Sequence, residues 1–461
     1  MHSRVPATQG CRLDRGGCVE RFDVIIIGSG GSGQTVAAAC AKAGKRVVVI
    51  DREPFGGTCA RCGCDPKKIL LAAAEAVTRT EALIGTGVEG VSGVSWPELI
   101  THKRQFTDPV PERVSERFAD MGVELISGVA EVTGDIEVSV GGRRLAADDL
   151  VIATGARPRT LDIVGEQLLT SSAKFMDLDD LPQRIVFAGG GYISFEFAEL
   201  AARAGADVTI IHRSSRVLEG FDSFLASKLV DRYRLLGIRV FTDVGLEAVV
   251  RTPAGELLAG TSAGDITADL VVHGAGRVPN VHGMGLELLG VEVSERGVVV
   301  ESSLRSTAHP HVWAVGDAAA LGLPLTPVAG RQGAIAAANI LGAAEHFDGT
   351  VTPSVAFTDP PLAAVGMSAE EALKDPARFE VLEHDTSEWF TQKRLGMTHC
   401  GARIVIDREA DRILGAHLLG MNADELINIF ALAMHLGATR AALKEGLWSY
   451  PTATSDLNYL L

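Results

Sequence analysis

A glycine-rich turn of the form GxGxxG lies at residues 28–33 (GSGGSG), between two short apolar segments. Residues 22–27 (FDVIII) form a β-branched run typical of a buried parallel strand, and residues 46–50 (RVVVI) form a second run, which ends at Asp51. Glycines allow the tight turn and the close approach of a pyrophosphate, whose charge the following helix N-terminus attracts. An acid at the end of the second strand can bind ribose hydroxyls. The pattern predicts a βαβ unit that binds a dinucleotide.

The same pattern returns about 160 residues further along the chain. Residues 184–187 (RIVF) lead into the glycine turn and helix of residues 189–196 (GGGYISFE), and residues 207–211 form the next strand. Two dinucleotide sites in one chain are therefore expected.

Basic residues follow the last strand of this second unit, where a site specific for NAD commonly has an acid. His212 and Arg213 stand there, with Arg216 nearby. An acid would repel a ribose 2′-phosphate, whereas Arg213 can pair with it, so NADPH is expected rather than NADH. The alternative is that these cations are solvated surface residues.

Composition and charge exclude several classes of protein. The 461 residues carry 43 Lys and Arg against 58 Asp and Glu, a formal net charge of −15, which argues against nucleic-acid binding. No apolar run reaches the ~20 residues of a membrane helix, and the first twenty residues lack the apolar stretch of a signal peptide. We therefore expect a cytoplasmic protein without a membrane partner.

Three of the seven cysteines lie together, at Cys59, Cys62 and Cys64. Cys59 and Cys64 are separated by four residues, close enough for a strained, reducible disulfide at the start of a helix. The helix dipole and Arg61 would stabilise a thiolate there. Three thiols could instead hold a soft metal, but no second Cys/His cluster completes a structural zinc site, so redox chemistry is favoured.

Seven motifs in a fixed order identify a resemblance. They are GSGGSG, GGTC-x-x-x-GC-x-P-x-K, ATGARP, GGGYISFE, GRVPN, VWAVGDAAA and FTDPP. With them the chain resembles the class I pyridine nucleotide–disulfide oxidoreductases, the flavoenzyme family of glutathione reductase, dihydrolipoamide dehydrogenase and mercuric reductase. The resemblance covers essentially everything after the first twenty residues.

The resemblance implies an α/β fold with two Rossmann-like dinucleotide-binding domains, in which an NAD(P) domain interrupts the FAD domain, followed by an α+β dimerisation domain. The expected divisions are a flexible tail at 1–20, an FAD-binding domain at 21–157, an NAD(P)-binding domain at 158–276, the second FAD and central part at 277–349, and a dimerisation domain at 350–461. A homodimer is also implied, because in this family the C-terminal segment completes the neighbouring subunit's site.

The matching motifs also imply the site residues. The catalytic positions are Cys59, Cys64, Lys68, Glu196, Tyr192 and Tyr450. The cofactor-binding positions are Gly28, Gly30, Gly33, Asp51, Thr58, Thr154, Gly155, Gly189, Gly191, Arg213, Arg277, Gly316 and Asp317. No metal ligand is expected.

Three of these positions have a direct chemical rationale. Lys68 matches the family lysine near the flavin N5, where a cation stabilises the anionic reduced flavin, and Glu196 matches its carboxylate partner. Tyr192 matches the aromatic lid that covers the flavin until the nicotinamide displaces it; the alternative is an ordinary core aromatic.

The resemblance implies a reaction in two halves. NADPH gives hydride to FAD, which passes the electron pair to a Cys59–Cys64 disulfide. Cys64 then rests as a thiolate in charge-transfer contact with the flavin, and Cys59 attacks a small-molecule acceptor.

The sequence departs from the family at its C-terminus. Disulfide-reducing members carry His-Pro-Thr-x-x-Glu, whose histidine is the acid/base for the outer thiol. Here Tyr450 stands for the histidine and Ser455 for the glutamate, and a phenol cannot shuttle protons near neutrality as an imidazole can. Nearby His435 lies on an apolar helical face, which predicts a core histidine rather than a substitute.

This departure argues against efficient reduction of glutathione disulfide or lipoamide and leaves the acceptor open among a disulfide, a quinone, a metal ion and a sulfur species. One alternative is a metal reductase like mercuric reductase, although the chain lacks a terminal cysteine pair; Cys11 and Cys18 are interpreted as incidental residues of the tail. Another is a redox-sensing or metal-sequestering flavoprotein with little turnover. Cys62 is interpreted as a small buried side chain rather than a third redox thiol.

Overall fold

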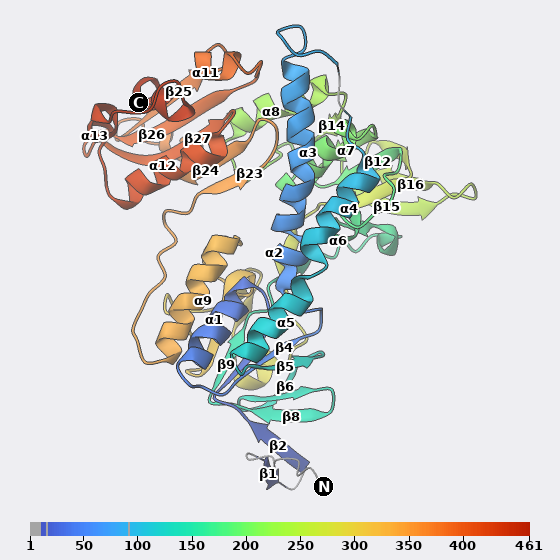
Figure 1. Cartoon of the computed structure of the whole chain (residues 1–461), viewed down its shortest axis with the longest axis vertical. Coiled ribbons are helices and arrows are strands. Elements are labelled where there is room, and N and C mark those ends of the chain that lie inside the picture. The colour runs from blue at the N-terminus through green and yellow to red at the C-terminus, as the bar shows by residue number, and fades with distance from the viewer. Residues whose placement is uncertain (1–10, 15–16, 91–92) are drawn as a thin grey trace. The chain divides into compact units, whose positions relative to one another are not determined.

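The computed structural model describes residues 11–14, 17–90 and 93–461, without the side chains of residues 11–18. The chain forms two compact units (Figure 1). The described part of the first unit lies within residues 1–65, 105–157 and 277–349, and that of the second within residues 66–104, 158–276 and 350–461. The units divide the chain after residues 65, 104, 157, 276 and 349, and the domain divisions given above stay a prediction.

A five-stranded parallel sheet forms the centre of the first unit. Its order is β22 (Val312–Ala314), β9 (Asp149–Ile152), β3 (Val24–Ile27), β4 (Val47–Asp51) and β5 (Glu124–Ser127). All four residues of β3 are buried, as a run of β-branched side chains in a central strand should be. With α1 (Gly31–Lys42) between β3 and β4, the first predicted βαβ unit is confirmed.

Two apolar cores cover the faces of this sheet. On one face, α1, α5 (Val110–Asp120) and α9 (Thr326–Ile340) pack together with the strands, and Figure 1 shows α1 and α9 side by side. The other face packs on a second sheet, with the order β1 (Cys11–Asp14), β2 (Gly17–Arg21), β8 (Arg143–Ala146), β7 (Glu137–Val140) and β6 (Glu131–Gly134).

The strands β1 and β2 correct the expectation of a flexible tail at residues 1–20. They form an antiparallel pair, and β2 then pairs in parallel with β8, so backbone hydrogen bonds fix this segment to the sheet. Residues 1–10 of the expected tail lie outside the described residues, as do the side chains of Cys11 and Cys18.

The second unit contains the other predicted βαβ unit. Its parallel sheet has the order β11 (Thr170–Ser171), β18 (Leu270–His273), β12 (Arg184–Ala188), β13 (Asp207–Ile211) and β14 (Arg239–Phe241). The helix α7 (Tyr192–Arg203) connects β12 to β13, and α8 (Ser223–Leu235) leads to β14. A small antiparallel sheet of β15 (Leu246–Arg251), β16 (Leu257–Thr261) and β17 (Gly264–Ala268) follows.

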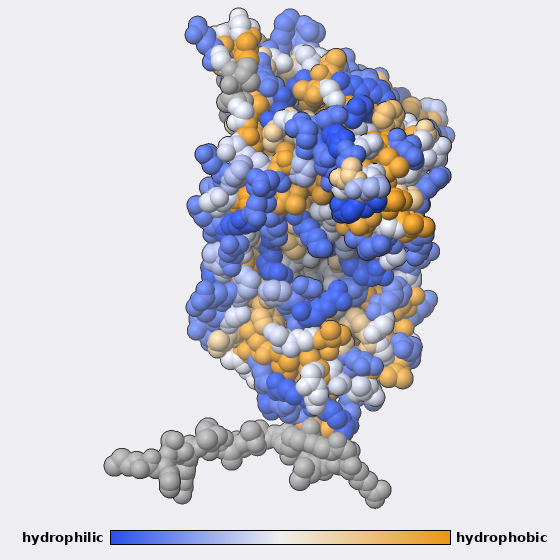
Figure 2. Space-filling model, turned by 90° about the vertical axis from the view of Figure 1, so that its right-hand side faces the viewer, coloured by the Kyte–Doolittle hydropathy of each residue, from blue (hydrophilic) through white to orange (hydrophobic). Residues whose placement is uncertain are grey.

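The end of the second unit is an antiparallel sheet covered by helices, which confirms the predicted α+β character. The strand order is β23 (Ser354–Ala356), β24 (Leu362–Gly366), β27 (Arg412–Leu419), β26 (Gly401–Asp407) and β25 (Phe379–Asp385). The apolar face of α12 (Ala423–His435) packs on β24 and β27 (Figure 1). On the face seen in Figure 2, hydrophilic residues are interspersed with apolar patches. Among the described residues, no helix is both long and apolar enough to cross a membrane.

Candidate functional site

The first glycine turn is shaped for a ligand that approaches the backbone closely. Gly28 has φ +110°, and a Cβ there would lie 2.2 Å from the Ala153 carbonyl oxygen. A Cβ on Gly33 would lie 2.1 Å from the carbonyl oxygen of Gly28. The helix α1 has Gly30 as its N-cap, without a side-chain capping bond, so its first N–H groups can bind an anion. These residues fit the pyrophosphate of FAD.

Asp51 is held in place at the end of β4. The backbone N–H and hydroxyl of Ser29 donate to Asp51 Oδ2 at 2.8 and 2.6 Å, and the N–H of Glu53 donates to Oδ1 at 3.0 Å. The carboxylate therefore bridges the glycine turn to the next strand and lies at the carboxyl edge of the sheet, where ribose recognition is expected in such folds.

A second group of residues in the first unit fits the rest of this cofactor. The N–H of Gly316 donates to Gln332 Oε1 at 2.8 Å, and Arg277 donates to the carbonyl oxygen of Ala156. Burial raises the pKa of Asp317, with the Arg277 charge opposing it. The buried hydroxyl of Thr154 has no hydrogen-bond partner among the described residues, which leaves it available to a ligand.

Gly155 and Thr58 lie in the same unit. The carbonyl oxygen of Gly155 accepts from the N–H of Asn280 at 2.9 Å, so it closes the turn after β9. Thr58 is exposed in the first turn of α2 (Gly57–Cys62), one residue before Cys59.

The cysteine segment consists of α2 and the start of α3 (Cys64–Ala82), which Gly63 separates. A Cβ on Gly63 would lie 2.8 Å from the Thr58 carbonyl oxygen, so only glycine fits this break. The break brings two thiols to one hydroxyl: Cys59 Sγ lies 3.1 Å and Cys64 Sγ 3.7 Å from Thr326 Oγ1.

Both cysteines are thiols in this structure. A side-chain hydrogen bond between them is the main cause that raises the pKa of Cys59; burial adds to it, and the Thr326 hydroxyl opposes it. Cys59 therefore keeps its proton beside Cys64, and the two sulfurs are in hydrogen-bond contact. Cys62 is part-buried at the end of α2. Within the described residues, no group of three or more His, Cys, Asp or Glu is arranged to hold a metal ion.

Thr326 was missed from the sequence. It is the first residue of α9 and is followed by a proline in the first turn of that helix. The signal that could have found it is that Pro327, which favours the first turn of a helix, directly follows a hydroxyl residue.

A buried carboxylate with two lysines lies in the second unit. Glu196 Oε2 lies 2.7 Å from Lys67 Nζ and 3.0 Å from Lys68 Nζ, and the N–H of Phe357 donates to Oε1 at 2.9 Å. Burial opposes ionisation of Glu196, but the two ammonium groups and the N–H together lower its pKa. The sequence named Lys68 alone, although Lys67 is the more buried lysine, with its side chain 9% exposed against 31%.

Aromatic rings cover both ammonium groups. Lys67 Nζ lies 4.7 Å from the ring centroid of Tyr192, and Lys68 Nζ lies 3.6 Å from that of Phe357. Tyr192 is the first residue of α7 and is 41% exposed, so it is not a core aromatic. Phe357, from the FTDPP motif, is a second residue that the sequence did not single out.

The second glycine turn repeats the design of the first. Gly189 has φ +120°, and a Cβ there would lie 2.2 Å from the Gly274 carbonyl oxygen. Gly191 is the N-cap of α7, again without a side-chain capping bond. The N–H of Gly190 donates to His212 Nδ1 at 3.0 Å, and His212 Nε2 donates to the Arg216 carbonyl oxygen at 2.9 Å. His212 therefore holds the turn, and its role is structural.

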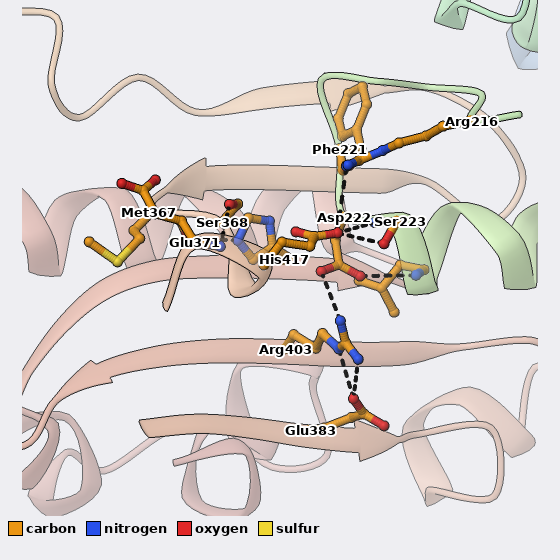
Figure 3. Close-up of polar contacts among 12 residues, drawn as sticks. Arg216, Phe221, Asp222, Ser223, Met367, Ser368, Glu371, Glu383, Arg403 and His417 are labelled. Carbon is orange, nitrogen blue, oxygen red and sulfur yellow. Dashed lines mark hydrogen bonds and ion pairs between the residues drawn. The ribbon is translucent and has the colours of Figure 1, made fainter. Parts of the chain in front are cut away.

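Of the three basic residues after β13, Arg213 remains available to a ligand. Arg216 donates to the carbonyl oxygen of Phe221 at 2.7 Å (Figure 3). Its guanidinium also lies 3.6 Å from the carboxylate of Glu370. Arg213 is exposed, and among the described residues no hydrogen bond or ion pair engages it. A Cβ on Gly245 would meet the Arg213 Cβ at 3.8 Å, which places this residue beside the neighbouring loop.

Polar contacts fix the start of α8 to the C-terminal part of the second unit (Figure 3). Asp222 caps α8 by accepting from Leu225 N–H at 3.0 Å, and its other oxygen lies 3.4 Å from Arg403, which also pairs with Glu383. The N–H and hydroxyl of Ser223 donate to Glu370 at 3.0 and 2.5 Å. Burial opposes ionisation of Glu370, but these bonds outweigh it and lower its pKa to about 2.

Tyr450 and Ser455 stand in the C-terminal segment at the positions of the family's histidine and glutamate. Tyr450 is 79% exposed between α13 (Arg440–Glu445) and the 3₁₀ turn η4 (Ala453–Asp456). Ser455, in the position of the family glutamate, forms a capping box with Thr452. The expectation that His435 is a core residue is wrong, because this histidine is exposed in the last turn of α12. The buried face of the helix consists of other residues, among them Phe430 and Ala433.

Comparisons with known proteins agree with this arrangement. Residues 22–333 match the family described as pyridine nucleotide-disulphide oxidoreductase, and residues 352–460 match its dimerisation domain. A glutathione reductase from Burkholderia cepacia is 32% identical over 445 residues, which cover 94% of this chain and 97% of that protein. A dihydrolipoyl dehydrogenase from Thermus scotoductus is 32% identical over 451 residues, covering 95% and 96%. The structure of the HOCl-induced flavoprotein disulfide reductase RclA from Escherichia coli matches with a TM-score of 0.85 and 26% identity, covering 95% of this chain and 99% of that chain.

Proposed function

Because this chain belongs to the pyridine nucleotide-disulphide oxidoreductase family, it is a flavin-dependent enzyme that uses FAD and NAD(P)H, and we propose that Cys59 and Cys64 are its redox-active pair. When bound, FAD supplies a carrier that takes an electron pair from the nicotinamide and releases it to a disulfide. The pair takes up two electrons and two protons as its sulfur–sulfur bond opens, and gives them up when an acceptor is reduced. The observation that carries this proposal is the hydrogen-bond contact of both thiols at Thr326.

The two cysteines have different roles in this proposal. Cys64 begins α3, whose N-terminal dipole stabilises a thiolate, whereas Cys59 keeps its proton. Cys59 is then the thiol that reacts with the acceptor, after the Thr326 hydroxyl has helped it to lose that proton. Cys62, at the end of α2, has no part in the exchange.

The site around Glu196 carries a net positive charge, because two lysines pair with one buried carboxylate. The ring of Tyr192, next to the second glycine turn, covers the Lys67 ammonium. We assign Lys68 to the flavin N5 position because its side chain is the more exposed of the two. Lys67 is then the buried cation that keeps Glu196 ionised.

The nicotinamide substrate is NADPH in this proposal. Arg213 is the cation available for a 2′-phosphate, because Arg216 is engaged by Phe221 and Glu370 and His212 by Gly190. Arginine binds a phosphate by two parallel hydrogen bonds, which a ribose hydroxyl cannot match.

The acceptor is a small molecule whose reduction needs no proton from the C-terminal segment, such as a quinone, a metal ion or a polarised sulfur species. Tyr450 and the capping role of Ser455 support this choice. The arrangement of the cysteines gives no support to metal sequestration, and the relatives named above are reductases and dehydrogenases.

We also propose that the enzyme is a homodimer, since the dimerisation domain leaves large apolar side chains exposed. Among the described residues of this domain they are Leu373, Phe390, Leu432, Leu436, Leu447, Tyr450 and Tyr459.

Anaerobic titration of the holoenzyme with NADPH tests the redox pair. The wild type should take up one more equivalent of NADPH than Cys59→Ala or Cys64→Ala, and should gain two thiols that react with a chromogenic disulfide. Cys62→Ala is the matched control and should keep the extra equivalent. Equal uptake by the wild type and both single variants would remove the Cys59–Cys64 pair from the reaction.

A further inference from the structure

The helix α7 uses two buried carboxyl groups to hold one neighbouring segment. Glu196 and Glu199 are one turn apart and only 1% and 2% exposed. Glu196 accepts from the N–H of Phe357, and Glu199 Oε2 accepts from the N–H of Asp359, both at 2.9 Å. Alternate N–H groups of an extended chain point the same way, ~6.6 Å apart, which matches the ~5–6 Å between helix residues three apart. The segment 357–359 is thereby fastened along α7.

This segment bears directly on Lys68. The Phe357 ring centroid lies 3.6 Å from Lys68 Nζ, and the same ammonium lies 3.0 Å from Glu196. Phe357 touches Lys68 with its ring and Glu196 with its backbone, so moving the segment would move the ring that packs on the ammonium.

Glu199 and Asp359 form a carboxyl pair whose charges are incompletely compensated. Asp359 is 5% exposed with the Thr78 hydroxyl beside its carboxyl group, and Glu199 Oε1 has no hydrogen-bond partner among the described residues. The Tyr233 hydroxyl donates to Glu199 Oε2 at 2.9 Å. Burial, followed by the charge of Asp359, raises the pKa of Glu199 to about 8, and burial raises the pKa of Asp359. Two adjacent carboxyls in a desolvated place do not both ionise near neutrality.

The charged and titratable groups around the pair come from every element packed against it. They are Glu196 and Arg203 on α7, Arg232 and Tyr233 on α8, Glu75 and Arg79 on α3, and Cys400 before β26. The Arg203 guanidinium also pairs with Glu81. Its positive charge is therefore divided between Glu81 and the carboxyl pair, and it does not fully compensate the negative charge that Glu199 and Asp359 would carry if both were ionised.

We propose that Glu199 and Asp359 retain one proton between them at neutral pH and act as positioning residues, which hold the segment 357–359 on α7 and so hold the Phe357 ring on Lys68. When that proton passes to solvent at alkaline pH, the two carboxylates repel, the segment separates from α7 and Lys68 loses its packing. The inference rests on the role proposed for Lys68.

Two readouts test the inference on the holoenzyme. Infrared difference spectra between neutral and alkaline pH should contain a protonated-carboxyl C=O band in the wild type that is missing in Glu199→Gln. The rate at which NADPH bleaches the flavin absorbance should fall at alkaline pH with an apparent pKa near that of Glu199, about 8. Glu199→Gln and Asp359→Asn should lose this alkaline limb, because neither leaves two carboxylates to repel.

Two further variants sharpen the test. Tyr233→Phe removes the bond that favours ionised Glu199, so its alkaline limb should shift to higher pH. Glu199→Leu cannot accept a hydrogen bond from the Asp359 N–H, and the loss of this buried acceptor should slow flavin reduction by NADPH at pH 7 about tenfold. Glu199→Gln keeps an acceptor oxygen, so its rate should be close to that of the wild type. Glutamine has the size of glutamate and still accepts both bonds, so it keeps the test valid if the leucine variant does not fold.

The inference is overturned if wild type and Glu199→Gln give the same infrared difference spectrum, or if Glu199→Gln keeps the alkaline limb. Lys68→Met separates this outcome from a failure of the proposed function. If Lys68→Met reduces at the wild-type rate, the role of Lys68 is wrong, whereas the infrared band still reports whether the carboxyl pair holds its proton.

Discussion

The hydroxyl of Thr326 lies 3.1 Å from the sulfur of Cys59, although 267 residues separate them in the chain. The contact exists because α9 begins at Thr326, against the break between α2 and α3 in the first unit. A hydroxyl at this position can donate to a thiolate as it forms, and it is the one hydrogen bond that lowers the pKa of Cys59.

Thr326→Val should therefore make Cys59 harder to ionise. A hydrogen bond to a charged group is worth ~1.5–3 kcal/mol, so the pKa of the thiol should rise by about one unit or more. The pH dependence of iodoacetamide alkylation in the reduced Cys64→Ala variant measures it. Thr326→Ser keeps the hydroxyl and should titrate like the parent; a valine variant that does the same would exclude the contact from the chemistry.

Glu196→Gln should destabilise the protein strongly. Lys67 would stay buried without its carboxylate, and removing one partner of a buried ion pair costs ~3–5 kcal/mol. Urea unfolding followed by circular dichroism measures the loss. Adding Lys67→Met to the same variant removes the uncompensated charge and should recover part of the stability; no recovery would show that Lys67 is not the residue left unpaired.

Arg213→Ala should weaken NADPH without weakening NADH. Losing a charged bidentate contact to the 2′-phosphate should raise KM for NADPH about tenfold or more. Steady-state assays with both nucleotides provide the measurement. Arg216→Ala serves as the comparison, since its guanidinium is engaged within the protein; a larger selectivity loss in that variant would move the phosphate site to Arg216.

The stability of the protein should decline as the pH rises from about 4.5 to about 8 through Glu199. Its folded pKa of about 8 lies above the ordinary value of 4.5, so the folded state holds this proton more tightly than the unfolded one. That contribution is complete below pH 4.5 and is lost by about pH 8, with a slope of at most about 1.4 kcal/mol per pH unit. Urea midpoints across this range measure the slope, which should be shallower in Glu199→Gln; parallel profiles would contradict the assignment.

Leu436→Glu should favour the monomer. This side chain is 71% exposed at the end of α12, in the domain that matches the family's dimerisation domain, and a charge there would have to be desolvated in an interface. Analytical ultracentrifugation gives the association state. Leu235→Glu, at an equally exposed position at the end of α8, should leave the dimer intact. A Leu436→Glu dimer as tight as the wild type would place the interface elsewhere.

The parts of the fold that local patterns specify were predictable. Both βαβ units follow from β-branched runs and glycine turns, and β13 begins and ends at the predicted residues 207 and 211. The cysteine pair and the Glu196 site followed from motifs. What could not be predicted depends on packing between distant segments: Thr326 reaches Cys59 only through the placement of α9, and Phe357 reaches Lys68 only because β23 ends beside α7.

The errors have the same origin. Lys67 and Lys68 are adjacent, and the sequence alone does not show that both ammonium groups converge on one oxygen. The strands β1 and β2 lie in a polar stretch; β2 is held by pairing with β8, more than 120 residues away along the chain, and β1 by pairing with β2. His435 was placed in the core because an apolar helix such as α12 does not reveal which of its faces meets the sheet.

The helix α7 begins at the second glycine turn and carries Glu196 and Glu199 within its next two turns. Because both carboxyl groups lie on the helix that begins at this turn, a displacement of the first turn of α7 would displace them together, and with them the two lysines paired with Glu196 and the segment 357–359.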